Sequence, residues 1–222
     1  FSQQNLQDYL DCPRRFYLRY VEHLDWPAIE SEPVLEQEHL AALGNQFHLL
    51  VQQALTGVPA EVIRDSIQEE DLARWWRNFE ALDLNLSNRK SLVEEPLSVP
   101  LAGFRLIAKP DLILVNLDHS ILVYDWKTSR HEPNATRLSR RVQTMVYPYV
   151  ITRCSPVFME RAEADPEALT MIYWYPEFPQ LQVTFEYSSG KYSSGEQTLV
   201  NLIGEISSLS HQEEFPKTAD EK

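Results

Sequence analysis

The segment KPDLILVNLDHSILVYDWK, residues 109–127, decides the fold. It contains two apolar runs with the composition of β-strands, joined by a polar turn at 116–120. Asp111 lies in the first run, and Asp125 and Lys127 close the second. Side chains two residues apart on a strand point to the same face, so Asp125 and Lys127 share a face. Antiparallel pairing of the two strands can bring Asp111 beside them.

These charged side chains point to chemistry because the apolar runs indicate a buried sheet. Two carboxylates and an ammonium group are costly in such a sheet unless something uses them. A divalent cation and an activated water molecule would use all three groups. The alternative is a salt-bridged hairpin at a solvated sheet edge.

The composition is that of a packed globular protein. The 222 residues are 43% hydrophobic and 11% aromatic, which suits one sizeable α/β domain and argues against disorder. No run approaches the roughly 20 apolar residues that cross a bilayer, so no membrane association is expected. Two cysteines give no disulfide framework, and we expect a cytoplasmic location.

The net charge of −13 bears on the partner. Proteins that bind nucleic acids are usually basic, so this charge lowers the expected non-specific affinity for DNA. It does not exclude such a partner, because a local basic groove and a bound metal can outweigh distant carboxylates.

The rest of the chain predicts a single sheet with helices packed on it. Periodicity and turn residues predict helices over 2–10, 14–21, 35–55, 66–82, 137–151 and 196–209, and strands over 168–175 and 180–187.

Four further pieces accompany the hairpin in chain order. The motif CPRRFYL occupies 12–18, and Gly44 and His48 are one turn apart in the long predicted helix. Thr128 and Ser129 directly follow the lysine. In the next predicted helix, residues 143 and 147 are a glutamine and a tyrosine that share a face.

Together these pieces resemble the RecB-type branch of the PD-(D/E)XK nuclease superfamily, which includes CRISPR-associated and AddB-like exonucleases. The resemblance runs from Ser2 to about Tyr149. It implies an α/β fold with a central mixed β-sheet flanked by helices, which is a restriction-endonuclease-like core. The chain, 1–222, would then be a single nuclease domain with an N-terminal helical region (about 1–85) and a catalytic core (about 90–187).

The resemblance also implies a site for Mg²⁺ or Mn²⁺. Its ligands would be His48, the carboxylates of Asp111 and Asp125, and the backbone carbonyl of Trp126. The second acid is Asp125 rather than glutamate, a change that the family tolerates. Taken alone, His48 would more often be a core histidine hydrogen-bonded to the backbone; its place four residues after Gly44 and ahead of the hairpin favours the ligand.

Three more residues acquire functions through the resemblance. Lys127 would orient or help to deprotonate the attacking water and offset phosphate charge. Gln143 and Tyr147 would position the nucleic-acid strand or the lysine. The alternative for Gln143 and Tyr147 is that they are ordinary helix-surface residues.

Other charged residues have two interpretations. Glu94 and Glu95 could reach the site, but we expect them to be exposed charges at a strand end. Two basic clusters could contact the phosphates of a nucleic acid. Alternatively, they are solvated faces that pair with the chain's many acids. These clusters are Arg14, Arg15 and Arg19, and Arg137, Arg140 and Arg141.

Cys12 matches the first ligand position of a [4Fe–4S] cluster that many nucleases of this branch hold. The other three ligands are cysteines at the far C-terminus, which this sequence lacks, and Cys154 matches no ligand position. We expect a longer native chain that continues beyond Lys222 with three cysteines. The alternatives are loss of the cluster and a Cys12 that serves as a small apolar core residue.

The leading hypothesis is a metal-dependent deoxyribonuclease that hydrolyses phosphodiester bonds of single-stranded DNA or DNA ends, as an exonuclease of DNA repair would. The alternative is a non-catalytic nuclease-fold module that binds nucleic acid or a protein partner. The acidic net charge favours dependence on a partner in either case. The complete set of His48, Asp111, Asp125 and Lys127 favours catalysis.

Overall fold

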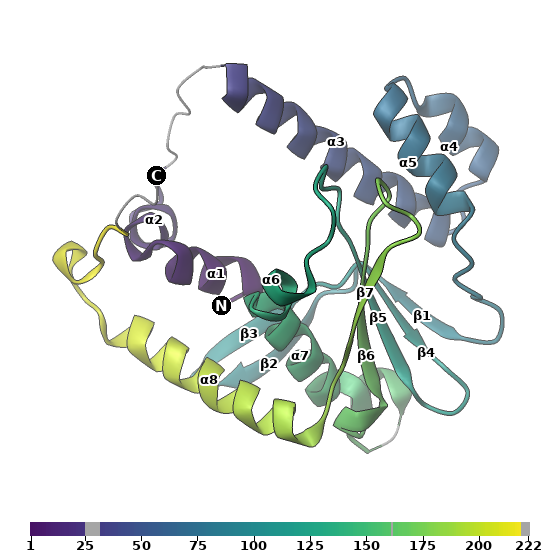
Figure 1. Cartoon of the computed structure of the whole chain (residues 1–222). Helices are drawn as coiled ribbons and strands as arrows, with labels where there is room; N and C mark the ends of the chain where they lie inside the picture. The colour runs from purple at the N-terminus through teal and green to yellow at the C-terminus, as the bar shows by residue number, and fades with distance from the viewer. Residues whose placement is uncertain (25–31, 161, 219–222) are drawn as a thin grey trace.

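The main sheet is mixed and has five strands in the order β1-β4-β5-β6-β7 (Figure 1). It is seen in a computed structural model that describes residues 1–24, 32–160 and 162–218. Neighbouring strands of this sheet pair antiparallel except β5 and β6, which are parallel. The expected central mixed sheet flanked by helices is confirmed. The strands are β1 (Lys90–Val93), β4 (Leu112–Val115), β5 (Ile121–Trp126), β6 (Leu169–Trp174) and β7 (Gln182–Glu186).

The expectation of a single sheet is wrong, because β2 (Leu97–Leu101) and β3 (Phe104–Ala108) form a separate two-stranded sheet. Ala102 and Gly103 make its turn with positive φ angles of 49° and 81°, which suit a tight hairpin. This hairpin packs against α7 (Val142–Met159) instead of extending the main sheet. Local alternation predicts a strand, but it does not say which sheet the strand joins.

Helices cover both faces of the main sheet. One face carries α7, α8 (Ser189–Ser208), α1 (Gln3–Asp11) and the short α2 (Pro13–Phe16), which continues as a π-helical turn at Tyr17–Val21. The other face carries α3 (Glu32–Leu55), α4 (Ala60–Ser66) and α5 (Glu70–Glu80), which group at the top of Figure 1. Short 3-10 turns lie at Pro166–Ala168 and Gln212–Glu214.

The helix predicted over 137–151 is interrupted. α6 (Ala135–Ser139) ends before α7 begins, and the extended backbone of Arg141 (φ −70°, ψ 138°) separates them. A break of one extended residue barely disturbs the apolar periodicity, so the sequence pattern does not reveal it.

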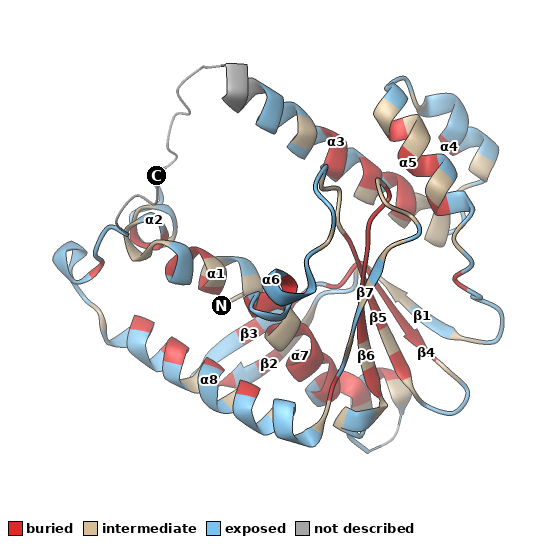
Figure 2. Ribbon diagram, in the orientation of Figure 1, coloured by how far each residue is buried: buried red, intermediate tan, exposed pale blue. Residues whose placement is uncertain are grey.

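Alternation along the central strands divides the interior into two cores. Ile113, Val123 and Met171 face α7 and α8, whereas Leu114 and Trp126 face α3–α5. Figure 2 shows the resulting buried stripes along β4, β5 and β6 and along the inward sides of α3 and α7. Burial on both faces explains why these strands are almost entirely apolar and why charged residues are confined to their ends.

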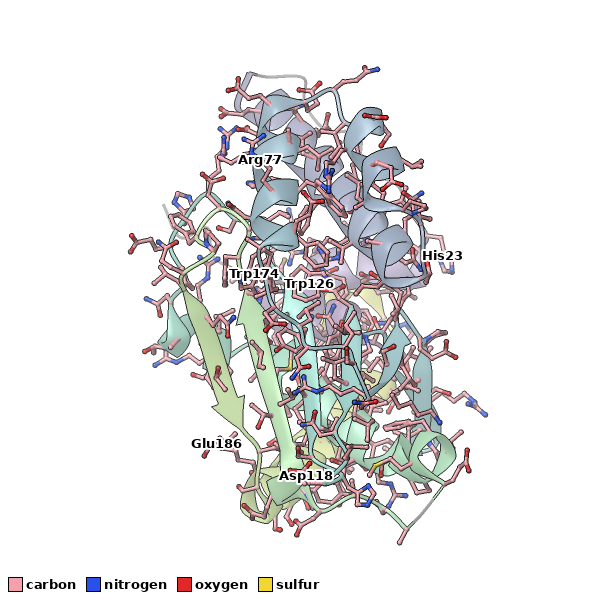
Figure 3. The ribbon with its side chains drawn as sticks, turned by 90° about the vertical axis from the view of Figure 1, so that its right-hand side faces the viewer. His23, Arg77, Asp118, Trp126, Trp174 and Glu186 are labelled. Carbon is pink, nitrogen blue, oxygen red and sulfur yellow. The ribbon has the colours of Figure 1, made fainter. Side chains whose placement is uncertain are left out.

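The two ends of the sheet differ in surroundings. Figure 3 shows Trp126 and Trp174 at the strand ends nearest the helical layer that carries Arg77, and Asp118 and Glu186 at the opposite ends. The charged residues that follow β5 therefore lie at the end next to α3 and α5. Within the part of the chain that the structure describes, none of the helices is both long and apolar enough to span a bilayer.

Candidate active site

The end of β5 holds a closed cluster of three polar side chains. Asp125 is 4% exposed, and the Lys127 Nζ atom lies 2.6 Å from its Oδ2 atom. The Lys127 ammonium donates a hydrogen bond to Gln143 Oε1 (2.8 Å), and the Gln143 amide donates to Asp125 Oδ1. Gln143 comes from α7, the helix on the face that Asp125 and Lys127 share. The structure thus brings Gln143 to the lysine.

Asp111 directly precedes β4 rather than lying within the strand. The pairing of Leu112 with Tyr124 in the antiparallel ladder places Asp111 opposite Asp125, next to the cluster. The Asp111 carboxylate accepts a hydrogen bond from the Trp126 backbone N–H (2.6 Å), and its other oxygen lies 3.0 Å from His48 Nδ1. One carboxylate therefore connects the end of β5 to α3.

Glu94 lies beside these groups, which is the interpretation that the sequence did not favour. Its side chain is 13% exposed and lies 3.9 Å from His48 Nδ1 and 2.6 Å from Lys109 Nζ. The expectation that Glu94 is an exposed strand-end charge is wrong, while Glu95 is exposed as expected. β1 pairs with β4 so that Val93 lies opposite Leu112, and this register carries Glu94 to Asp111. The position of Glu94 follows only from the pairing of β1 with β4, two strands that the β2–β3 hairpin separates along the chain.

These groups fit a divalent cation. His48, Glu94 and Asp111 each offer one ligand atom, and the three atoms lie within 4.8 Å of one another. Next to this trio, the buried Asp125 Oδ2 atom receives no hydrogen bond of good geometry, although the lysine ammonium is close. Carboxylate oxygens are the ligands that hard cations such as Mg²⁺ and Mn²⁺ prefer. The trio and Asp125 would hold the cation; the Trp126 carbonyl remains a predicted ligand.

The electrostatics of the site bear on this fit. Burial, and next the charge of Asp125, raise the pKa of Asp111 to about 6. Burial alone would lower the pKa of His48, but hydrogen bonds to Asp111 and Glu94 and the charges of Asp111 and Asp125 outweigh it and raise the pKa to about 10, so a cation bound at His48 would displace a proton. Carboxylates that repel one another in a buried site gain most from a cation.

Gly44 lets the segment after Lys127 approach α3. A Cβ atom on Gly44 would lie 2.5 Å from the Thr128 hydroxyl oxygen, far inside normal contact. The glycine sits one helical turn before His48, so the helix that carries the histidine and the loop that follows the lysine meet here. Close packing, rather than backbone freedom, explains the glycine.

We expect Gly44→Ala to lower the free energy of unfolding of the parental chain, since overpacking costs about 1–3 kcal/mol and outweighs the gain in helix propensity. In a Thr128→Ala background the obstructing hydroxyl is gone, and the same substitution should instead stabilise by about 1 kcal/mol. Urea unfolding of the four proteins measures this coupling. An equal effect in both backgrounds would contradict the contact.

Tyr147 lies close to the site. The side chain is buried, and its hydroxyl donates a hydrogen bond to the Lys109 carbonyl (2.9 Å). This bond joins α7 to the turn that leads into Asp111. The two functions predicted for Tyr147 stay predictions.

The first basic cluster pairs with the chain itself. Arg15 and Arg19 lie 3.1 Å and 3.4 Å from the carboxylate of Asp8, which is buried in α1. The interpretation as a face that pairs with the chain's own acids therefore holds for these two arginines.

Cys12 lies between α1 and α2, beside the described C-terminal residues. The Thr218 hydroxyl donates to the Asp11 carbonyl, and Phe215 packs against Phe16. Burial would raise the pKa of Cys12, but hydrogen bonds from Thr218 and the neighbouring backbone outweigh it and lower the pKa. Cys154 is buried in α7. Two cysteines do not fit a [4Fe–4S] cluster, which needs four ligands, so the cluster remains a prediction about a longer chain.

Comparisons with known proteins bear on the family and the fold. A family model for the PD-(D/E)XK nuclease superfamily matches residues 1–221. Among solved structures, a "Putative exonuclease" from Eubacterium rectale aligns with a TM-score of 0.53 and 10% identity over 92% of this chain and 79% of that one. The crystal structure of SSO0001 aligns with a TM-score of 0.47 and 16% identity over 95% and 76%. No curated protein sequence matches the chain.

Proposed function

The chain belongs to the PD-(D/E)XK nuclease superfamily, and from this we propose that it is a metal-dependent nuclease that hydrolyses phosphodiester bonds of DNA. The observation that carries the proposal is the joining of Asp111, Asp125, Lys127 and Gln143 at one strand end, next to His48 and Glu94. The substrate would be single-stranded DNA or DNA ends, in keeping with the RecB-type branch. The likeness to the Eubacterium rectale protein supports the fold.

The cation, Mg²⁺ or Mn²⁺, would supply charge neutralisation and an acidified water when bound. The protein's own residues would do the rest. Lys127, held by Asp125 and Gln143, keeps its ammonium at the mouth of the site, where it can orient the attacking water and offset phosphate charge. The buried carboxylates fix the position of the cation relative to that ammonium.

The second candidate is a nuclease-fold module that binds nucleic acid or a protein partner without cutting. The net charge of −13 favours dependence on a partner in either case. A catalytic function is favoured because Asp125, Lys127 and Gln143 contact one another at the strand end that also carries Asp111. We also propose a cytoplasmic location, since the two cysteines are unpaired.

The experiment that separates the two candidates is a Mn²⁺ titration by calorimetry, followed by incubation with labelled single-stranded DNA, duplex DNA and RNA. We expect Mn²⁺ binding and cleavage that requires the metal, fastest on single-stranded DNA. Glu94→Gln should weaken Mn²⁺ binding by about 10–100-fold. Glu95→Gln is the matched control, because the neighbouring carboxylate is exposed. DNA binding with no cleavage in any metal would favour the non-catalytic module.

A further inference from the structure

A cavity adjoins the cluster of Asp125, Lys127 and Gln143. Its volume is about 200 Å³, and it lies between the segment that follows β5, the α6–α7 junction and the end of β6. The charged and aromatic side chains that line it are Lys127, His131, Glu132, Arg137, Arg141 and Tyr175. Because Lys127 belongs to both, a group bound in this cavity would lie directly beside the reacting phosphate.

The cavity concentrates positive charge in an acidic protein. Arg137 and Arg141 contribute permanent positive charges from either side of the α6–α7 break, and Glu132 is the one carboxylate among its lining residues. Among the residues that the structure describes, neither guanidinium has an acid within 4 Å. The unpaired cations suit an external anion, and the forked guanidinium is the group that matches phosphate.

Tyr175 adds a hydrogen-bond donor to the cavity. The residue is 4% exposed overall and lines the cavity, and its hydroxyl forms no hydrogen bond with any described side chain or backbone group. The hydroxyl is not among the buried polar atoms that lack a partner, so it is open to the cavity and free to donate to a ligand there. An anion held by the two arginines would accept this hydrogen bond.

We propose that this cavity binds a phosphate of the nucleic-acid strand next to the phosphate that is cleaved, through Arg137, Arg141 and Tyr175. The proposal rests on the proposed nuclease function. The ligand is a phosphate anion, which is either an internal diester of the strand or the monoester at its end. Arg137 in α6 and Arg141 at the start of α7 both line the cavity, whereas Arg140 between the two helices does not.

The test compares Arg137→Ala and Arg141→Ala with Arg140→Ala, which removes the same charge from the same segment. With single-stranded DNA and saturating Mn²⁺, we expect Arg137→Ala and Arg141→Ala each to raise KM about tenfold or more, with kcat little changed. Arg140→Ala should keep the parental KM. Tyr175→Phe should raise KM by about 2–10-fold. All three arginines are exposed, so the variants should keep the parental Tm.

A binding measurement makes the result independent of cleavage. Fluorescence anisotropy with labelled single-stranded DNA in EDTA should show weaker binding for Arg137→Ala and Arg141→Ala. It should also show a flatter dependence of log Kd on log salt, by about 0.7 per lost phosphate contact. If the parental protein binds DNA but does not cleave it, the nuclease function is contradicted. The cavity proposal then still depends on the binding of the arginine variants alone. Equal effects of all three arginine substitutions would overturn the cavity proposal, because the arginines would then act only through overall charge.

Two further oligonucleotides identify the source of the phosphate. Strands of the same sequence with and without a 5′-phosphate, and with and without a 3′-phosphate, are compared on the parental protein and Arg141→Ala. If the cavity holds a terminal monoester, one terminal phosphate should strengthen binding to the parental protein and have no effect on the variant. If it holds an internal diester, all strands should lose affinity equally on Arg141→Ala. No loss on any strand would overturn the proposal.

Discussion

Asp111→Asn and Asp125→Asn should each reduce cleavage by about 10³-fold or more, since a cation held by carboxylates contributes several kcal/mol and each 1.36 kcal/mol is tenfold in rate. Asparagine is the informative replacement at Asp111. Its amide oxygen can still accept the Trp126 N–H, which alanine would leave buried without a partner. The fold should therefore survive, and the lost activity reports on the metal site.

A thermal shift separates metal binding from turnover. At a Mn²⁺ concentration 100 times its Kd, binding stabilises by about 2.7 kcal/mol, which corresponds to a rise in Tm of about 5–10 °C for a chain of this size. We expect this rise for the parental protein and its absence in both variants. Asp118→Asn is the matched control, because Asp118 lies in the turn of the same hairpin at the far end of the sheet (Figure 3). Parental cleavage by either variant would show that the site is wrongly placed.

Lys127→Met should retain Mn²⁺ binding and lose turnover by about 10²–10⁴-fold, the range for a group that acts on protons and developing charge. Methionine removes the ammonium but keeps an apolar stem against Tyr173, whose ring centre lies 5.5 Å from Nζ. Asp125 keeps its hydrogen bond from Gln143, and a bound cation would compensate its charge. The KM for DNA should rise less than kcat falls.

Single-turnover cleavage and Mn²⁺ calorimetry on the same samples check this prediction. Lys90→Met serves as the control, because it removes one positive charge from an exposed strand end. Loss of Mn²⁺ binding in Lys127→Met would assign the lysine to the structure of the metal site instead. A kcat equal to that of the control would remove it from catalysis.

The part of the site that the sequence could predict is local. Asp125 and Lys127 share a face because they are two apart on a strand, and a short turn makes β4 and β5 antiparallel neighbours. Those two facts are enough to place Asp111 beside Asp125. Gln143 could be expected near the lysine only through the resemblance, since no local rule places a helix 16 residues later over that strand end.

Two features of the site depend on contacts between distant segments, so no local pattern contains them. β1 joins β4 across the intervening β2–β3 hairpin, and this register brings Glu94 to His48 and Asp111. α3 meets the loop after Lys127 where Gly44 faces Thr128. A pattern of apolar residues gives the period of an element but not its partner, which depends on the burial that the whole chain can achieve.

Alternation and turn residues in the sequence predict the hairpin that carries Asp111, Asp125 and Lys127 and a sheet with helices packed on it. The mixed sheet and the superfamily are expected through the resemblance, which rests on several motifs spread from Ser2 to about Tyr149. Only the tertiary structure shows that Glu94 lies beside His48 and Asp111, that the second hairpin forms its own sheet and that Arg137 and Arg141, but not Arg140, line a cavity. The reason is physical: side-chain direction along one strand is fixed by backbone geometry, whereas the packing of distant elements is fixed by the combined burial of all of them.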